Sequence, residues 1–135
     1  MIQRIQTIYL AIAVILVISF TFTPTFSEGL LFPQKWLTFL LTGALTFSGT
    51  LSLISIFLYN NRQRQSKIVL FAMFGMVIAL GTSLGIFLSV GTPDFNSFTE
   101  ILGTILLLLG WIFLFMARKA IQKDEKLIKS MDRIR

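Results

Sequence analysis

The sequence predicts an all-α integral membrane protein, a four-transmembrane-helix bundle followed by a C-terminal cytoplasmic amphipathic helix. Its 135 residues are 55% hydrophobic and only 13% charged, with a mean hydropathy of +0.82. A single small soluble core cannot bury that much apolar surface. No segment alternates apolar and polar residues as a strand does, and lipid admits only helices or closed barrels. Helical spans are therefore expected.

Four uninterrupted apolar stretches have the length of a membrane span, at residues 5–23, 36–59, 68–90 and 98–116. Helices of about 19 to 24 residues, at about 1.5 Å per residue, cross a hydrocarbon core of about 30 Å. The segments between them are short and are expected to be loops, because they contain turn residues such as Pro24, Gly29, Asn60 and Pro93. Consecutive helices should then be antiparallel. The first stretch lacks a signal-peptide cleavage site and should be retained.

The basic residues are distributed unevenly between the two sides of this predicted bundle. One side carries Lys35 with Glu28, Asp94 and Glu100. The other carries eleven of the twelve basic residues: Arg4, Arg62, Arg64, Lys67, Arg118, Lys119, Lys123, Lys126, Lys129, Arg133 and Arg135. Loops rich in Lys and Arg stay in the cytoplasm, so both termini are predicted to be cytoplasmic. Trp36 and Tyr59 fall at the predicted interfaces, where amphipathic rings are enriched.

The last nineteen residues, 117–135, read "ARKAIQKDEKLIKSMDRIR" and contain seven basic residues. At about 100° per residue their Ile, Leu, Met and Ala side chains form one stripe, which predicts a basic amphipathic helix. Glu125 precedes Lys129 by four residues, the favourable order for an ion pair. Asp124 lies inside the apolar stripe. A carboxylate there fits a protein surface that supplies a Lys, an Arg or a backbone N–H better than it fits lipid.

Three uses of this basic helix remain open. Self-packing, or binding to anionic lipid headgroups, comes first, because basic residues near a membrane attract such lipids. Docking into a groove of a partner protein is close behind, since the stripe and Asp124 suit it. Contact with ribosomal RNA is third, because the segment lacks aromatic or Arg-rich interleaving, and nucleic acid is not an expected partner.

Small residues recur at four-residue spacing in the second and third spans. They form three rows: Ala44, Ser48 and Ser52; Gly75, Ala79 and Ser83; and Gly81, Gly85 and Ser89. Such rows let helix backbones approach closely. Two rows on the third span suggest two neighbours. Internal packing of both rows is the expected arrangement, and a partner subunit on one of them is the alternative.

The composition gives no support for catalysis. Without Cys or His there is no thiolate, zinc ligand or imidazole base, and the hydroxyl groups have no evident base beside them. The spans contain no ionisable group except Glu100 at an edge, where it complements a helix N-terminus, and this argues against a transporter or pump acting alone. No catalytic residue, metal site or cofactor is predicted.

Three segments, "MIQRIQTIYL", "LYNNRQRQ" and "AIQKDEKLIKSMDRIR", resemble a family of small Bacteroidota membrane proteins catalogued as domain of unknown function 4293. The resemblance covers essentially the whole chain. It implies four transmembrane helices with a charged C-terminus in the bacterial inner membrane, and it carries no established activity. The patterned residues that should gather at one membrane face are Gln3, Arg4, Gln6, Lys123, Asp124, Glu125, Ser130, Asp132, Arg133 and Arg135.

Recognition at that face is therefore expected rather than chemistry within the spans. The predicted function is a non-enzymatic accessory or scaffold subunit of a larger inner-membrane complex. The alternatives are a small oligomeric channel or transporter lined by Ser and Thr, and then an enzyme acting on lipid. The candidate contacts to a partner or to lipid are Arg4, Gly81, Gly85, Lys123, Asp124, Glu125, Lys129, Asp132, Arg133 and Arg135.

Overall fold

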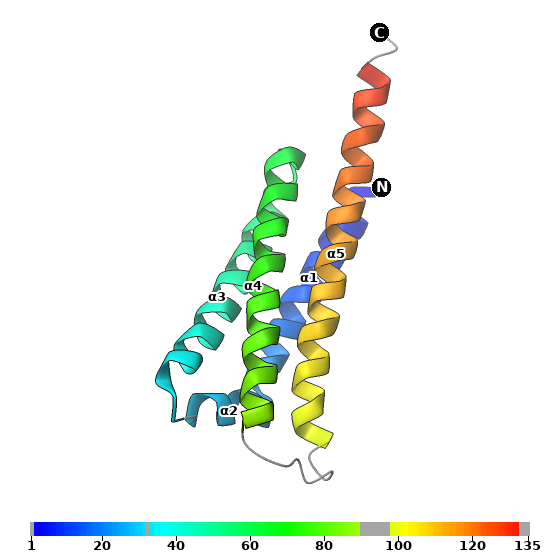
Figure 1. Cartoon of the computed structure of the whole chain (residues 1–135). Helices are drawn as coiled ribbons and strands as arrows, with labels where there is room; N and C mark the ends of the chain where they lie inside the picture. The colour runs from blue at the N-terminus through cyan, green and yellow to red at the C-terminus, as the bar shows by residue number, and fades with distance from the viewer. Residues whose placement is uncertain (1, 32, 90–97, 133–135) are drawn as a thin grey trace.

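The computed structural model of the chain describes residues 2–31, 33–89 and 98–132. These residues form five helices and no strand, which confirms the predicted all-α class. The helices are α1 (Ile2–Thr21), α2 (Pro24–Leu31), α3 (Lys35–Phe57), α4 (Arg62–Ser89) and α5 (Phe98–Asp132) (Figure 1).

Three of these helices are long and apolar enough to cross a membrane, namely α3, α4 and the part of α5 from Ile101 to Met131. Residues Ile5–Thr21 of α1 meet that criterion only together with α2, and the two are bent by 63° at their junction. The described residues thus offer three candidate spans, or four if the bent pair counts as one. The first predicted span, 5–23, ends earlier than expected, because α1 stops at Thr21.

Helix α4 begins well before the apolar stretch that predicted it. Residues 60–67 were expected to be a loop, but the helix starts at Arg62. Asn61 caps it: its Oδ1 accepts a hydrogen bond from the Arg64 backbone N–H at 3.3 Å, and its carbonyl accepts one from the Gln65 N–H at 2.9 Å. The Gln, Arg and Lys residues that follow are good helix formers, so the helix extends past the apolar boundary.

Helix α2 lies in a segment that was expected to be a loop. Pro24 supplies its first residue, a position at which proline costs no hydrogen bond, and the Thr23 carbonyl accepts from the Phe26 N–H at 3.1 Å. The helix lies across one end of the bundle and contacts α3, α4 and α5 (Figure 1). Its approach to α5 needs Gly103, because a Cβ there would lie 2.5 Å from Thr25 Oγ1.

The bundle is closed by its first and last long helices. The most extensive contacts join α1 to α5 and α3 to α4, α4 also packs on α5, and α1 touches α3 less. Fully buried side chains include Leu10 and Phe20 of α1, Leu41 of α3, Met76 of α4, and Leu107 and Leu114 of α5. Helix α5 runs without a break through residues 116 and 117, and in Figure 1 its C-terminal part extends beyond the other helices.

Candidate functional site

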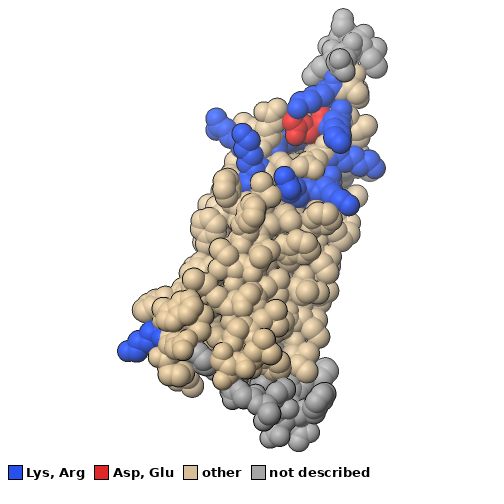
Figure 2. All heavy atoms as spheres, in the orientation of Figure 1, with Lys and Arg blue, Asp and Glu red and all other residues tan. Residues whose placement is uncertain are grey.

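Basic side chains gather at the end of the bundle where α1 begins and where α5 extends past it (Figure 2). We call this the basic end. Among the side chains that the structure describes, it comprises Arg62, Arg64 and Lys67 of α4 and Arg118, Lys119, Lys123, Lys126 and Lys129 of α5. Helix α3 begins at Lys35, at the opposite end of the bundle (Figure 1).

The buried carboxylate of Asp124 has its partner within the same chain. Gln6 Nε2 donates a hydrogen bond to Asp124 Oδ2 at 2.5 Å, and the two side chains are only 3% and 5% exposed. The expectation of a Lys, an Arg or a backbone N–H as the donor was wrong, because an amide of α1 supplies it. Asp124 is therefore part of the interface between α1 and α5 and needs no other protein to satisfy it.

The apolar stripe of α5 continues past the point where the bundle covers it. Ala117 and Ile121 are fully buried, and Asp124 nearly so. The next apolar side chains along the helix, Leu127 and Met131, are 46% and 63% exposed. The first half of the predicted amphipathic helix thus packs on its own chain, and the second half presents an uncovered apolar surface between basic residues. We call residues 126–131 the α5 tip.

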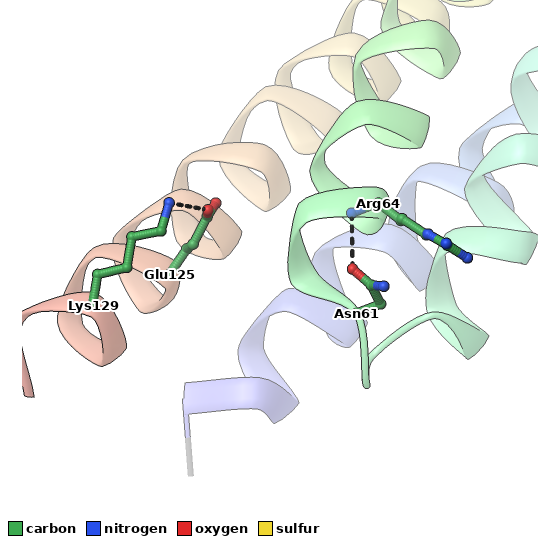
Figure 3. Close-up of polar contacts among 4 residues, drawn as sticks. All are labelled: Asn61, Arg64, Glu125 and Lys129. Atoms are coloured by element: carbon green, nitrogen blue, oxygen red, sulfur yellow. Dashed lines mark hydrogen bonds and ion pairs between the residues drawn. The ribbon is translucent and has the colours of Figure 1, made fainter. Parts of the chain in front are cut away.

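Glu125 and Lys129 form the ion pair that their spacing predicts. Lys129 Nζ lies 2.7 Å from Glu125 Oε1, one turn apart on α5 (Figure 3). The hydrogen bond from Lys129 lowers the pKa of Glu125 below its ordinary value of 4.5. Glu125 therefore stays ionised at neutral pH.

A groove of about 440 Å³ opens between the α3–α4 turn and α5. Its lining combines cations, amides, one carboxylate and two less polar side chains: Tyr59, Asn60, Asn61, Arg62, Gln63, Glu125, Ile128 and Lys129. Figure 3 shows Glu125 and Lys129 of α5 with Asn61 and Arg64 of the neighbouring chain segment. The arrangement brings donors from two separate elements to one opening, which suits recognition of a polar or anionic group.

The family model described as "Domain of unknown function (DUF4293)" matches residues 2–134. The chain belongs to this family. No curated protein and no solved structure matches it. The DUF4293 match spans both Gln6 and Asp124, whose hydrogen bond joins the first helix of the chain to the last.

One row of small residues in this DUF4293 chain packs as expected. A Cβ at Gly75 of α4 would lie 3.3 Å from the Ala44 carbonyl oxygen and 3.3 Å from Ser48 Cβ. Ser48 Oγ also donates to the Ala72 carbonyl at 2.9 Å, and Ala79 and Ser83 are buried. Close approach of α3 and α4 thus depends on this row.

The other row on α4 does not pack inside the bundle, so the expectation of internal packing for both rows was wrong. A Cβ at Gly81 or Gly85 would have no atom of another element within 4 Å. Ser89 Oγ donates to the Gly85 carbonyl at 2.6 Å and uses its hydroxyl within its own helix. This row lies on the outside of the described bundle.

The remaining predicted contact residues are placed as follows. Lys123 is exposed on α5 beside Asp124. Arg4 and Asp132 lie near the ends of α1 and α5, but their side chains are outside the described ones, as is that of Glu100 in the first turn of α5. Arg133, Arg135 and Asp94 lie outside the described residues.

Sequence reasoning missed Gln65 and undervalued Gln6. Gln65 is 2% exposed, and its Nε2 donates to the Ser55 carbonyl at 2.9 Å, which ties the start of α4 to the end of α3. A buried glutamine at the edge of an apolar stretch looks like an ordinary loop residue in the sequence. Gln6 appeared only as part of the family pattern, because nothing local reveals a partner 118 residues away.

Proposed function

We propose that this DUF4293 protein is a multi-pass protein of the bacterial inner membrane with both termini in the cytoplasm, and that it acts as a non-enzymatic accessory or scaffold subunit of a larger membrane complex. Large apolar side chains exposed along the long helices support the membrane placement, among them Ile15, Phe39, Phe74 and Leu88. The basic end supports a cytoplasmic position for the start of α1 and the tip of α5.

The observation that carries the subunit role is the apolar stripe that leaves its own bundle. Asp124 is the last stripe residue covered by α1, and Leu127 and Met131 beyond it are exposed. Exposed apolar side chains on a projecting helix are costly in water unless something covers them. An apolar groove with an acidic rim would accept them and would meet Lys129 at its edge.

The path of α5 favours a protein over the bilayer as the cover. The helix continues unbroken from Arg118 to Asp132, a rise of about 21 Å. A helix that lies in the plane of the membrane would have to break where it leaves the bundle. Because α5 does not break there, its tip projects away from the spans, where a partner can reach it.

The test compares two matched pairs of substitutions on the tip. Leu127→Ser with Met131→Ser removes the exposed apolar pair, and Lys126→Ser with Ser130→Ala changes a neighbouring side of the same turns with the same spacing. After mild detergent extraction of native membranes, we expect the wild type and the second pair to migrate in one large complex, and the first pair to migrate as the chain alone. Equal migration of all three proteins would reject docking through the stripe.

A second candidate is the small oligomeric channel, which one observation favours. Thr42, Thr46 and Thr50 follow one another at four-residue spacing on α3, and Thr46 and Thr50 are exposed. Each hydroxyl donates to a carbonyl of the preceding turn, at 2.7 to 2.9 Å, and keeps acceptor capacity. Several copies could line a polar path with this row. Purified protein in liposomes that passes no ion or solute would remove this candidate.

A further inference from the structure

The groove at the basic end has features of an anion site that the subunit role does not use. Arg62, at the first residue of α4, and Lys129, on α5, face it from two different elements. Asn60 and Asn61 add amide donors from the turn. Cations and amides that converge from separate elements recognise phosphate well, because each can donate to a different phosphate oxygen.

The electrostatic surroundings of the groove are strongly positive. Among the described side chains, the basic end has eight cations and two carboxylates. Asp124 is buried and accepts a hydrogen bond from Gln6, and Glu125 is paired with Lys129. The first turn of α4 also directs the positive end of its helix dipole toward this region. Glu125 is the carboxylate among the residues that line the groove, and its charge partly offsets that of Lys129.

The depth of the groove points to a lipid as the source of the phosphate. Arg62 precedes Lys67, the last polar residue before the apolar part of α4, by about 7.5 Å of helix rise. Headgroups add about 5 to 7 Å on each side of the hydrocarbon core, so the Arg62 backbone falls at their outer edge and its long side chain can reach back to the phosphates. Tyr59, a residue type enriched at membrane interfaces, lines the same groove.

We infer that this groove binds the phosphate of an anionic phospholipid of the cytoplasmic leaflet. The inference rests on the membrane placement proposed above and shares Lys129 with the α5 tip, whereas Arg62 lies outside the tip and distinguishes the two proposals. Glu125 weakens the site, because its carboxylate holds Lys129 Nζ at 2.7 Å, although the ammonium group keeps hydrogens for the phosphate. Its own charge opposes the anion.

The experiment measures lipid binding to the full chain in a neutral detergent by native mass spectrometry. The probes are phosphatidylglycerol and phosphatidylcholine with identical acyl chains. We expect a preference for phosphatidylglycerol that falls about fivefold in Arg62→Gln and in Lys129→Gln. Lys119→Gln is the matched control, because it removes one positive charge from the same basic end. Lys119 does not line the groove, and its Nζ lies over the Phe115 ring instead. In Lys119→Gln the preference for phosphatidylglycerol should fall by less than about twofold.

Glu125→Gln is a variant whose affinity for phosphatidylglycerol should rise rather than fall. Removal of the opposing charge should tighten phosphatidylglycerol binding, and a folding defect cannot imitate that result. If Arg62→Gln and Lys119→Gln lost the preference for phosphatidylglycerol equally, the lipid would be attracted by overall charge, and the proposed site would be wrong. Binding of both lipids alike would also overturn it. Displacement of the lipid by an equal concentration of inorganic phosphate would identify free phosphate as the ligand and reject the lipid.

Discussion

Gln6 of α1 donates a hydrogen bond to Asp124 of α5, and both side chains are buried at the basic end of the bundle. The contact joins the first helix to the last and fixes where the stripe of α5 stops being covered. Leu127 and Met131, beyond Asp124 on that stripe, are exposed and available to another molecule. The pair therefore links the stability of the bundle to the surface that we propose for docking.

Replacement of Gln6 by Leu should lower the free energy of unfolding by about 1–3 kcal/mol, because the buried carboxylate loses its donor. Denaturant titration of the purified protein in detergent measures this. Lys123→Ala, at an exposed neighbour of Asp124, is the control and should change stability by less than about 0.5 kcal/mol. The double variant Gln6→Leu with Asp124→Leu should recover much of the loss, since it buries no unpaired charge. If the double variant instead lost as much stability as the two single variants together, a direct contact between Gln6 and Asp124 would be contradicted.

Two glycines of α4 should respond in opposite ways to alanine. At Gly75 the new Cβ would press on the Ala44 carbonyl and on Ser48, so Gly75→Ala should destabilise by about 1–3 kcal/mol. At Gly81 the new Cβ meets nothing within 4 Å, so Gly81→Ala should stabilise the isolated chain by up to about 1 kcal/mol through helix propensity. Thermal unfolding of the two variants side by side decides the matter. Similar shifts of the melting temperature in the two variants would contradict the finding that the Gly75 row faces α3 and the Gly81 row faces outward.

The close approach of α2 to α5 should make Gly103 intolerant of a side chain. A Cβ there would meet Thr25 Oγ1 at 2.5 Å and Thr25 Cβ at 2.9 Å, both on a short rigid side chain. Gly110 is the matched control on the same helix, because its Cβ would press on the flexible end of Met76, at 2.7 Å, and would lie at an ordinary contact distance of 3.8 Å from Leu16 Cβ. We expect Gly103→Ala to lower the melting temperature clearly more than Gly110→Ala. The reverse order would mean that α2 does not pack on α5 as described.

The pairing of Glu125 with Lys129 should be visible in its titration. Since the folded state lowers the pKa of Glu125, the pair stabilises the fold above the ordinary pKa near 4.5 and loses that effect as the pH falls through the lower folded value. The carboxylate is partly solvated, so the gain in stability is small. NMR titration of Glu125 should give a pKa below 4.5 that rises in Lys129→Met. An unchanged value in that variant would exclude the pair in solution.

Hydropathy in the sequence predicted where the apolar segments lie but not where the helices end. Residues 36–59, 68–90 and 98–116 lie almost entirely within α3, α4 and α5. Polar residues that are good helix formers continue α4 back to Arg62 and α5 on to Asp132, because a helix does not stop where the apolar stretch stops. Helix α2 escaped prediction since Pro24 and Gly29 suggest a turn, although proline is also a good first residue of a helix.

The candidate site was predictable only in its local parts. The ion pair of Glu125 and Lys129 follows from their spacing on one helix. Asp124 could be recognised as a misplaced acid, but its partner depends on the packing of α1 against α5, which no local pattern encodes. The two rows of α4 consist of similar small residues at the same spacing. The sequence pattern therefore does not distinguish the row that faces α3 from the row that faces outward.

Site-specific photocrosslinking in native membranes tests most directly whether the stripe of α5 passes from its own bundle to another protein. A photoreactive amino acid replaces Met131 on the exposed stripe, Ile121 on the buried stripe, or Lys126 on another side of the helix. We predict a discrete adduct to a second protein from position 131, and none from positions 121 and 126. Adducts of equal yield from positions 131 and 126, or none from position 131, would contradict the account.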